Sequence, residues 1–146
     1  MRIVVITAAL LAALAAGTEP AMAAESAARP TVRVEQSRFG RILFDGRGFV
    51  LYAFTRDPRG RSVCSGACAA AWPPAIVKRP LRAGKGTRAR LLGTTRRADG
   101  RLQLTYAKRP LYFYVGDRSP GQILCQDVEE FGGLWLVVRA NGSLVR

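Results

Sequence analysis

The sequence predicts a mainly β fold: a small single domain of two similar half-repeats, each based on a β-hairpin, with one short helix near a C-x-x-x-C segment. The first observation is a phrase that occurs twice, LYAFTRD at 51–57 and LYFYVGD at 111–117. The second is a set of Asp-Gly and Asn-Gly dipeptides between apolar runs, which is typical of tight hairpin turns. The third is the lack of a long amphipathic helical pattern.

The hairpins follow from the patterns on either side of these turns. Residues 31–35 alternate polar and apolar, as a half-buried strand does. Residues 42–44 and 49–54 flank DGRG, in which Asp45-Gly46 is expected to supply the positive φ of a tight turn. Two further hairpins are predicted in the same way, from 91–97 with 101–106 and from 134–139 with 144–145. The helical stretch is short, 65–72, because Pro73-Pro74 ends it.

The repeated phrase predicts two inner strands. Side chains alternate between the faces of a strand, so Tyr52 and Phe54 share one face of the first copy. The opposite face of that copy carries Leu51 and Ala53, and the second copy repeats this arrangement with Tyr112 and Tyr114 opposite Leu111, Phe113 and Val115. Both faces are apolar or aromatic, so we expect each copy to be covered on both sides. The same shift of sixty positions aligns the hairpins and gives half-repeats at about 41–75 and 101–139.

The start of the chain has the pattern of a secretory signal peptide. Arg2 precedes an apolar run at 3–16, and a small-x-small site follows at 21–23. The run is shorter than the ~20 residues that a bilayer span needs. We therefore expect a signal peptide at 1–23, a flexible leader at 24–30, one β-rich domain at 31–146 and no transmembrane segment after cleavage. No cysteine near the cleavage site offers an acceptor for lipid, so the mature chain is expected to be periplasmic or secreted without a lipid anchor.

The charge of the chain points to an anionic partner. Lys and Arg number 23 against 10 Asp and Glu, a formal net charge of +13. Export and the lack of a known motif argue against nucleic acid, so an anionic envelope surface or an acidic protein is expected instead. Residues 78–101 hold nine basic residues and one acid, and their first part is predicted to be an exposed loop. The predicted contact patch is Lys78, Arg79, Arg82, Lys85, Arg88 and Arg90.

Two carboxylates occupy matching positions in the repeated phrase and have two interpretations. Asp57 and Asp117 could act as an acid/base pair of a hydrolase if both faced one cleft. An Asp just past a strand more often accepts hydrogen bonds from backbone N–H groups of the following turn. Each is followed by turn-forming sequence, DPRG and DRSPG. The sequence therefore favours a structural role for the repeated motif.

The three cysteines allow three pairings in an oxidising compartment. Chain entropy favours a long loop, with Cys64 or Cys68 bonded to Cys125. Closing a loop of that length is expected to stabilise the fold by about 4 kcal/mol, and closing the short loop by about 2 kcal/mol. Proximity favours Cys64 with Cys68, because residues four apart around a turn lie within disulfide range. Each pairing leaves one thiol unpaired.

The residue types that the chain lacks argue against several kinds of catalytic and metal site. The chain has no histidine, and both methionines, Met1 and Met22, belong to the predicted signal peptide. The usual metal and haem ligands and the commonest general base are therefore lacking. We expect no enzyme, no cofactor and no metal site. The expected function is that of a non-catalytic envelope binding module, and the alternative is a thiol-based redox or small-ligand protein that uses Cys125. No feature indicates an oligomeric state.

The motifs together resemble a known family. Tyr52, Phe54 and Asp57 form Y-x-F-x-x-D, and Tyr112, Tyr114 and Asp117 form Y-x-Y-x-x-D, beside CSGACAAAWPP and FGGLW. This combination, over roughly residues 40–142, resembles a family of bacterial secreted proteins and lipoproteins that is named for a Y-x-[FWY]-x-x-D repeat and described as a secreted repeat of unknown function. The resemblance implies an exported tandem-repeat protein without an assigned activity. It also implies that Cys125 is the odd thiol, which favours the pairing of Cys64 with Cys68.

Overall fold

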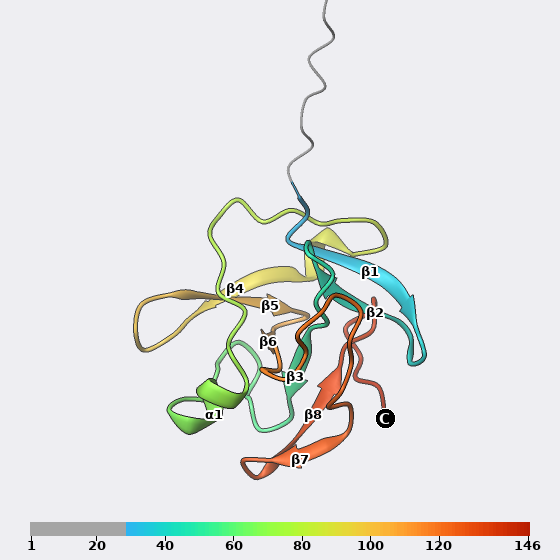
Figure 1. Ribbon diagram of the computed structural model, residues 1–146. Helices are drawn as coiled ribbons and strands as arrows, with labels where there is room; N and C mark the ends of the chain where they lie inside the picture. The colour runs from blue at the N-terminus through green and yellow to red at the C-terminus, as the bar shows by residue number, and fades with distance from the viewer. Residues whose placement is uncertain (1–28) are drawn as a thin grey trace, which may run out of the picture.

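The computed structural model describes residues 29–146, and the predicted signal peptide (1–23) and residues 24–28 of the predicted leader lie outside the described residues (Figure 1). The predicted mainly β fold with one short helix is confirmed. The elements in chain order are β1 (Val32–Ser37), β2 (Gly40–Asp45), β3 (Tyr52–Phe54), α1 (Ala67–Ala71), a 3-10 turn (Ala89–Leu91), β4 (Leu92–Arg96), β5 (Leu102–Tyr106), β6 (Arg109–Tyr112), β7 (Val128–Glu130) and β8 (Gly133–Val137).

The first hairpin differs from the predicted one. Strand β2 pairs along its whole length with β1, from Ser37 opposite Gly40 to Val32 opposite Asp45. The predicted pairing of β2 with the next strand is limited to the region beside the turn, where Phe44 bridges Val50. The positive φ of that turn falls on Gly48 (92°) and not on Gly46. The sequence pattern located this turn but did not identify the main partner of β2.

The six-stranded sheet has the order β4-β5-β6-β3-β8-β7, so β6 and β3 lie at its centre. These two strands contain the repeated phrase and run antiparallel, with Tyr52 opposite Tyr112 and Ala53 opposite Leu111. Because equivalent residues of the two copies face each other, an approximate twofold axis passes between Tyr52 and Tyr112. The two half-repeats therefore meet along the phrase that they share.

Each half-repeat gives its last extended segment to the other half. Residues 73–77 of the first half lie between β5 and β6: the Leu104 N–H donates to the Ala75 carbonyl (2.8 Å) and the Ala75 N–H donates to the Leu111 carbonyl (2.9 Å). In the same way β8 pairs with β3, and just beyond it the Val138 carbonyl accepts from the Leu43 N–H of β2 (2.9 Å). Neither half closes its sheet alone.

The two central strands are covered on both faces, as predicted. One face packs into a cluster that contains Tyr52, Tyr112, Trp72 and Trp135, all fully buried. The other face packs into a second cluster around residues that include Leu51, Ala53, Leu104, Tyr106 and Leu111. The prediction fails only at the end of the second copy, where Val115 is 58% exposed because β6 has already ended at Tyr112.

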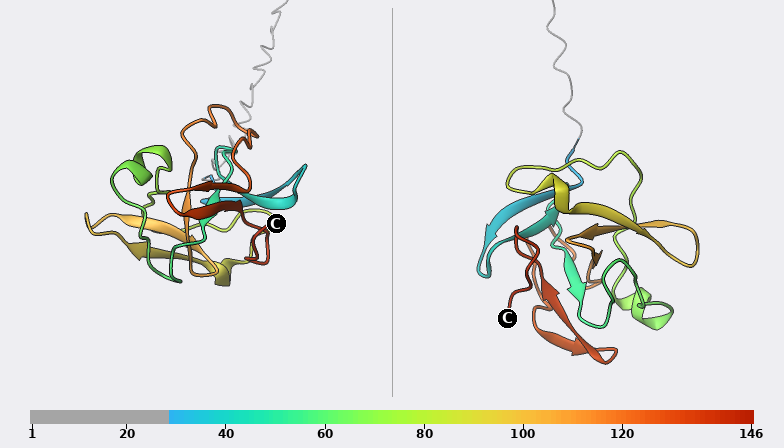
Figure 2. Two further views of the ribbon diagram at one scale, coloured as in Figure 1. Left: turned by 90° about the horizontal axis from the view of Figure 1, so that it is seen from below. Right: turned by 180° about the vertical axis from the view of Figure 1, so that it is seen from behind.

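The segment after the helix runs across the molecule to the first hairpin. Helix α1 is shorter than predicted and is followed by Pro73-Pro74. Residues 78–88 then form an extended loop beside β1, where the Gly84 N–H donates to the Val32 carbonyl (2.7 Å) (Figure 1). A Cβ at Gly84 would lie 2.7 Å from the same carbonyl oxygen, so this close approach requires glycine. Figure 2 shows the loop beside β1 from behind. No helix within residues 29–146 is long and apolar enough to cross a membrane.

Candidate functional site

The hydrogen bonds of the two motifs cross between the half-repeats, because the tyrosine of each motif binds the aspartate of the other. The Tyr52 hydroxyl donates to Asp117 Oδ2 (2.8 Å), and the Tyr112 hydroxyl donates to Asp57 Oδ2 (2.6 Å). The other oxygen of each carboxylate accepts a backbone N–H from the far end of the following loop, Val63 for Asp57 (2.8 Å) and Leu124 for Asp117 (3.0 Å). Each Asp therefore accepts one hydrogen bond from the loop of its own half-repeat and one from the tyrosine of the other half-repeat.

The electrostatic environment of the two carboxylates is similar but not equal. Burial is the main cause that raises the pKa of both Asp57 and Asp117, and the hydrogen bonds from tyrosine partly oppose it. The positive charge of Arg97 also lowers the pKa of Asp57. Burial raises the pKa of the partner tyrosines Tyr52 and Tyr112 far above the ordinary value, so both keep their protons and act as donors.

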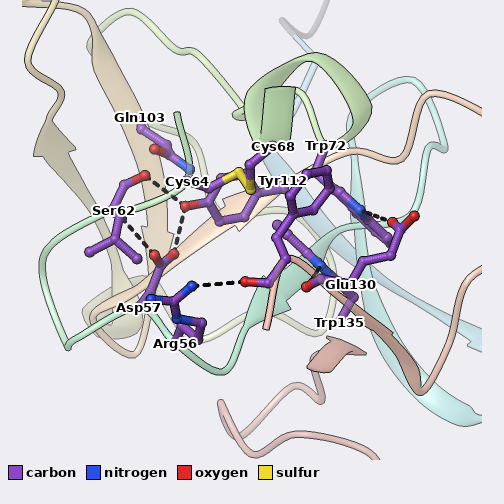
Figure 3. Close-up of a disulfide and its surroundings, with 12 residues drawn as sticks. Arg56, Asp57, Ser62, Cys64, Cys68, Trp72, Gln103, Tyr112, Glu130 and Trp135 are labelled. Atoms are coloured by element: carbon purple, nitrogen blue, oxygen red, sulfur yellow. Dashed lines mark hydrogen bonds between the residues drawn. A yellow bond between two sulfur atoms is a disulfide. The ribbon is translucent and has the colours of Figure 1, made fainter. Parts of the chain in front are cut away.

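The two tryptophans stack beside these pairs. The rings of Trp72 and Trp135 lie 4.0 Å apart and 4° from parallel. Each also meets a tyrosine edge-on: Trp72 with Tyr52 at 5.2 Å and Trp135 with Tyr112 at 5.1 Å. Trp72 Nε1 donates to Glu130 Oε2 (2.7 Å), as Figure 3 shows. The repeated motif thus builds a satisfied aromatic core, and its hydroxyls and carboxylates already bond one another.

The disulfide joins Cys64 and Cys68, with Cα atoms 5.3 Å apart, at the start of α1 (Figure 3). Its segment is tied to the sheet by Arg97, whose guanidinium donates to the Cys64 carbonyl (2.8 Å) and to the Ser62 hydroxyl (2.7 Å). That hydroxyl lies 2.7 Å from the hydroxyl of Tyr112. The short pairing that proximity favoured is therefore the one present.

Cys125 is the free thiol of the described residues and is half-buried against the aromatic core. It directly follows Leu124, as Cys64 directly follows Val63, so the two cysteines occupy equivalent places after the two Asp-bound amides. Burial raises the pKa of the Cys125 thiol. The thiolate is the reactive form, so this environment works against a reactive cysteine. No group of three or more His, Cys, Asp or Glu side chains within residues 29–146 is placed to hold a metal.

The predicted basic patch is exposed but is not one compact site. Its six side chains, Lys78, Arg79, Arg82, Lys85, Arg88 and Arg90, are spread along the extended loop and the 3-10 turn. Two of them line hollows beside β4: Arg79 lines one of about 540 Å³ and Arg90 lines one of about 680 Å³. The other four line neither hollow.

The larger hollow, which we call the basic groove, gathers positive charge from three separate segments. Arg59 follows the first motif, Arg90 belongs to the 3-10 turn, and Lys108 lies in the β5–β6 turn. Thr105 adds a hydroxyl, and no acidic residue lines the groove among the described residues. The three basic side chains are exposed to solvent.

Two contacts hold the basic groove in shape. Arg59 Nη1 donates to the carbonyl of Ala107 (2.7 Å), which fixes the loop after the first motif against the β5–β6 turn. Ala107 and Lys108 have φ of 50° and 61°, which a two-residue hairpin turn requires. The neighbouring Arg109 has a lowered pKa, mainly through burial and also through the positive charge of Arg59. Positive charge is therefore concentrated here, and no carboxylate within residues 29–146 lines the groove to compensate it.

Sequence reasoning did not find Arg59 and Lys108. They lie outside the basic run at 78–101 and join Arg90 only because the first motif and the β5–β6 turn meet at β4. The available signal was the repeat itself, which places the loop after β3 next to the hairpin of the other half.

The exchanged strands and crossed motifs define a class of protein in which two tandem repeats form one β domain. The family described as a secreted repeat of unknown function, Lipoprotein_15, matches residues 34–76 and 93–139. The chain belongs to this family. Both matched segments begin before the half-repeats predicted from the sequence, because they include most of β1 and β4. No match was found among curated proteins or among solved structures.

Proposed function

We propose that this secreted repeat protein is a non-catalytic binding module of the cell envelope that holds polyanionic partners in its basic groove. The observation that carries the proposal is the convergence of Arg59, Arg90 and Lys108 on one hollow of about 680 Å³ that no acidic residue lines within 29–146. Cationic side chains with a hydroxyl beside them suit carboxylate or phosphate groups.

Binding has better support than the other chemistries. The candidate acid/base residues Asp57 and Asp117 each accept two hydrogen bonds inside the fold, so a hydrolytic role would have to break the contacts that join the half-repeats. A redox role of Cys125 has the disadvantage that burial raises the pKa of its thiol.

The test distinguishes binding at the basic groove from general attraction by the net charge of the protein. A variant with Arg59→Gln, Arg90→Gln and Lys108→Gln removes three positive charges from the basic groove. A control with Arg41→Gln, Arg118→Gln and Arg146→Gln removes three from exposed positions outside it. Both variants have the same net charge.

Retention on phosphatidylglycerol vesicles and on an acidic polysaccharide would be measured over a range of salt concentrations. We expect the groove variant to lose about tenfold or more in affinity and to show a flatter salt dependence, and the control to change little. Equal losses in the two variants would show attraction by overall charge and would overturn the proposal.

A further inference from the structure

Strand β4 leaves backbone groups unpaired along the edge of the six-stranded sheet. It is the terminal strand, and within residues 29–146 its strand partner is β5 alone. The Ala107 N–H donates to the Leu91 carbonyl and the Arg97 N–H donates to the Arg101 carbonyl, so odd-numbered residues face β5. In an antiparallel pair such residues alternate with residues that face away. Leu92, Thr94 and Arg96 therefore direct their backbone groups outward.

These outward groups are free to bind another strand. The Leu92 N–H is used locally, because it donates to the carbonyl of Ala89. The carbonyl of Leu92 and both backbone groups of Thr94 and Arg96 have no hydrogen-bond partner within residues 29–146. Five groups in a row thus present the alternating donors and acceptors of a sheet edge.

The two hollows lie on opposite faces of this edge. The basic groove lies on the face of Gly93, which pairs with Thr105, and both residues line it. The smaller hollow lies toward Leu92 and is walled by Leu81 and Arg79, whose guanidinium donates to the Thr94 hydroxyl (3.0 Å). Leu92 and Gly93 line both hollows, because the strand that carries them lies between the two. A strand laid along β4 would send alternate side chains into the two hollows.

We propose that the outer edge of β4 binds an extended acidic polypeptide segment, which adds a strand to the sheet and places alternate carboxylates against Arg59, Arg90 and Lys108. This inference rests on the proposed function of the basic groove and names the partner of that site. Strand addition obtains affinity from backbone hydrogen bonds and specificity from alternate side chains. The chain offers both at β4, the first along the edge and the second in the two hollows.

The structure favours a polypeptide over other polyanions and over a second copy of the same edge. A polysaccharide or a lipid surface can satisfy the basic side chains, but neither supplies amide donors and acceptors at the spacing of a strand. Two β4 edges would bring like charges together, which disfavours self-pairing. The opposite edge, β7, is unsuited to an acidic segment because Glu129 and Glu130 lie on it and it spans only Val128–Glu130.

The experiment uses synthetic peptides and the intact mature protein. The probe is a peptide of alternating Glu and Val. Its carboxylates should face the basic groove, and its apolar side chains should face the smaller hollow beside Leu81. One control has the same composition in a scrambled order. Two more carry backbone N-methyl groups, on every Val in one and on every Glu in the other. Polygalacturonate supplies carboxylates without amides.

Strand addition predicts a specific pattern of affinities. The alternating peptide should bind, and one N-methylated form should bind about tenfold or more weakly, because only one set of N–H groups faces β4. The other N-methylated form should keep its affinity, and the scrambled peptide should bind more weakly. Amide hydrogen exchange at Thr94 and Arg96 should slow in the complex.

Two outcomes separate the inference from the proposed function. If both N-methylated peptides and polygalacturonate bind as well as the alternating peptide, strand addition is wrong while anion binding by the groove stands. If neither peptides nor polygalacturonate nor phosphatidylglycerol vesicles bind, both proposals fail.

A protein variant tests the same edge from the other side. Thr94→Pro removes an outward N–H without removing a donor to β5, and proline is tolerated at such edge positions. Thr94→Val keeps the N–H and, like proline, loses the hydroxyl that Arg79 contacts. We expect the proline variant to lose about tenfold in affinity for the alternating peptide relative to the valine variant. Equal affinities of the two folded variants would overturn strand addition, and if the proline variant does not fold, the N-methyl comparison decides.

Discussion

The Tyr52 hydroxyl donates to the carboxylate of Asp117 at 2.8 Å, across the centre of the sheet and from one half-repeat to the other. Tyr112 and Asp57 repeat the contact in the opposite sense at 2.6 Å. A motif that is contiguous in sequence is therefore completed in space by its second copy. The contact links the two halves at the point where their central strands meet.

A double-mutant cycle tests this crossing. Tyr52→Phe should lower the free energy of unfolding by about 1–3 kcal/mol, because it leaves a buried carboxylate oxygen without its donor. Combined with Asp117→Ala, it should show a coupling energy of about 1 kcal/mol or more. The same Tyr52→Phe change combined with Asp57→Ala should be additive, since these residues share no hydrogen bond. Chemical denaturation measures all three, and coupling within the repeat instead of across it would contradict the structure.

The free energy of unfolding should depend on pH in the way expected for a buried carboxyl group with a raised pKa. Burial raises the pKa of Asp117, so the folded protein holds this proton to a higher pH than the unfolded chain does. The stability that this group contributes is full below the unfolded pKa and is lost as pH rises through the folded pKa. Relative to Asp117→Asn, the wild type should therefore lose stability as the pH rises above the ordinary Asp pKa of about 4.

Asp99 provides the control for that experiment. Hydrogen bonds from Arg101 lower the pKa of its exposed carboxyl. Its contribution should be present above the unfolded pKa and be lost as pH falls through the folded pKa, so the difference between wild type and Asp99→Asn should have the opposite slope. The same slope for both variants would contradict the assigned environments.

The exchanged segments predict that the halves fold only together. A chain divided between Gly86 and Thr87 separates residues 73–77 from the β5–β6 pair that they join and separates β8 from β3. Fragments 29–86 and 87–146 should each be largely unfolded alone, and mixing them should restore the sheet in a 1:1 complex. Circular dichroism and size-exclusion chromatography would show this, and a stable fold in either fragment alone would be the contrary result.

The disulfide should give a modest stabilisation. It closes a short loop, with a sequence separation of 4, so replacing Cys64 and Cys68 by Ala should cost about 2 kcal/mol. Thiol titration of the denatured wild-type protein should find the single free thiol of Cys125. The Cys125→Ser variant should keep the disulfide, and two titratable thiols in that variant would contradict the assignment.

Local patterns were enough to predict the strands at the centre of the fold. The alternation in 51–54 and 111–113 identified β3 and β6 as inner strands, because apolar side chains on both faces require cover on both sides. Asp99-Gly100 also located the β4–β5 hairpin, but the turns of the β1–β2, β5–β6 and β7–β8 hairpins lack such a dipeptide and were not predicted. The half-repeats followed from one shift of sixty positions, and the short helix followed from the prolines after it.

Long-range pairing could not be predicted from the same patterns. Nothing local indicates that residues 73–77 insert between β5 and β6, since the segment PPAIV contains two prolines and has no strand pattern. The basic groove depends on that topology, because Arg59 reaches Lys108 only when the loop after β3 meets the other half. A charge run can be counted in a sequence, but a site formed from three distant segments cannot.

The exchange of final segments between the half-repeats also determines how many copies of the repeat a stable fold needs. A chain with a single copy would expose an unfilled gap in its sheet and a strand with no place to bind, and two such chains would complete each other as a dimer. Fusion of two copies places both completing segments in one chain, so that each half always has its partner. Longer arrays built on this plan should therefore grow by pairs, with each even-numbered copy completing the one before it.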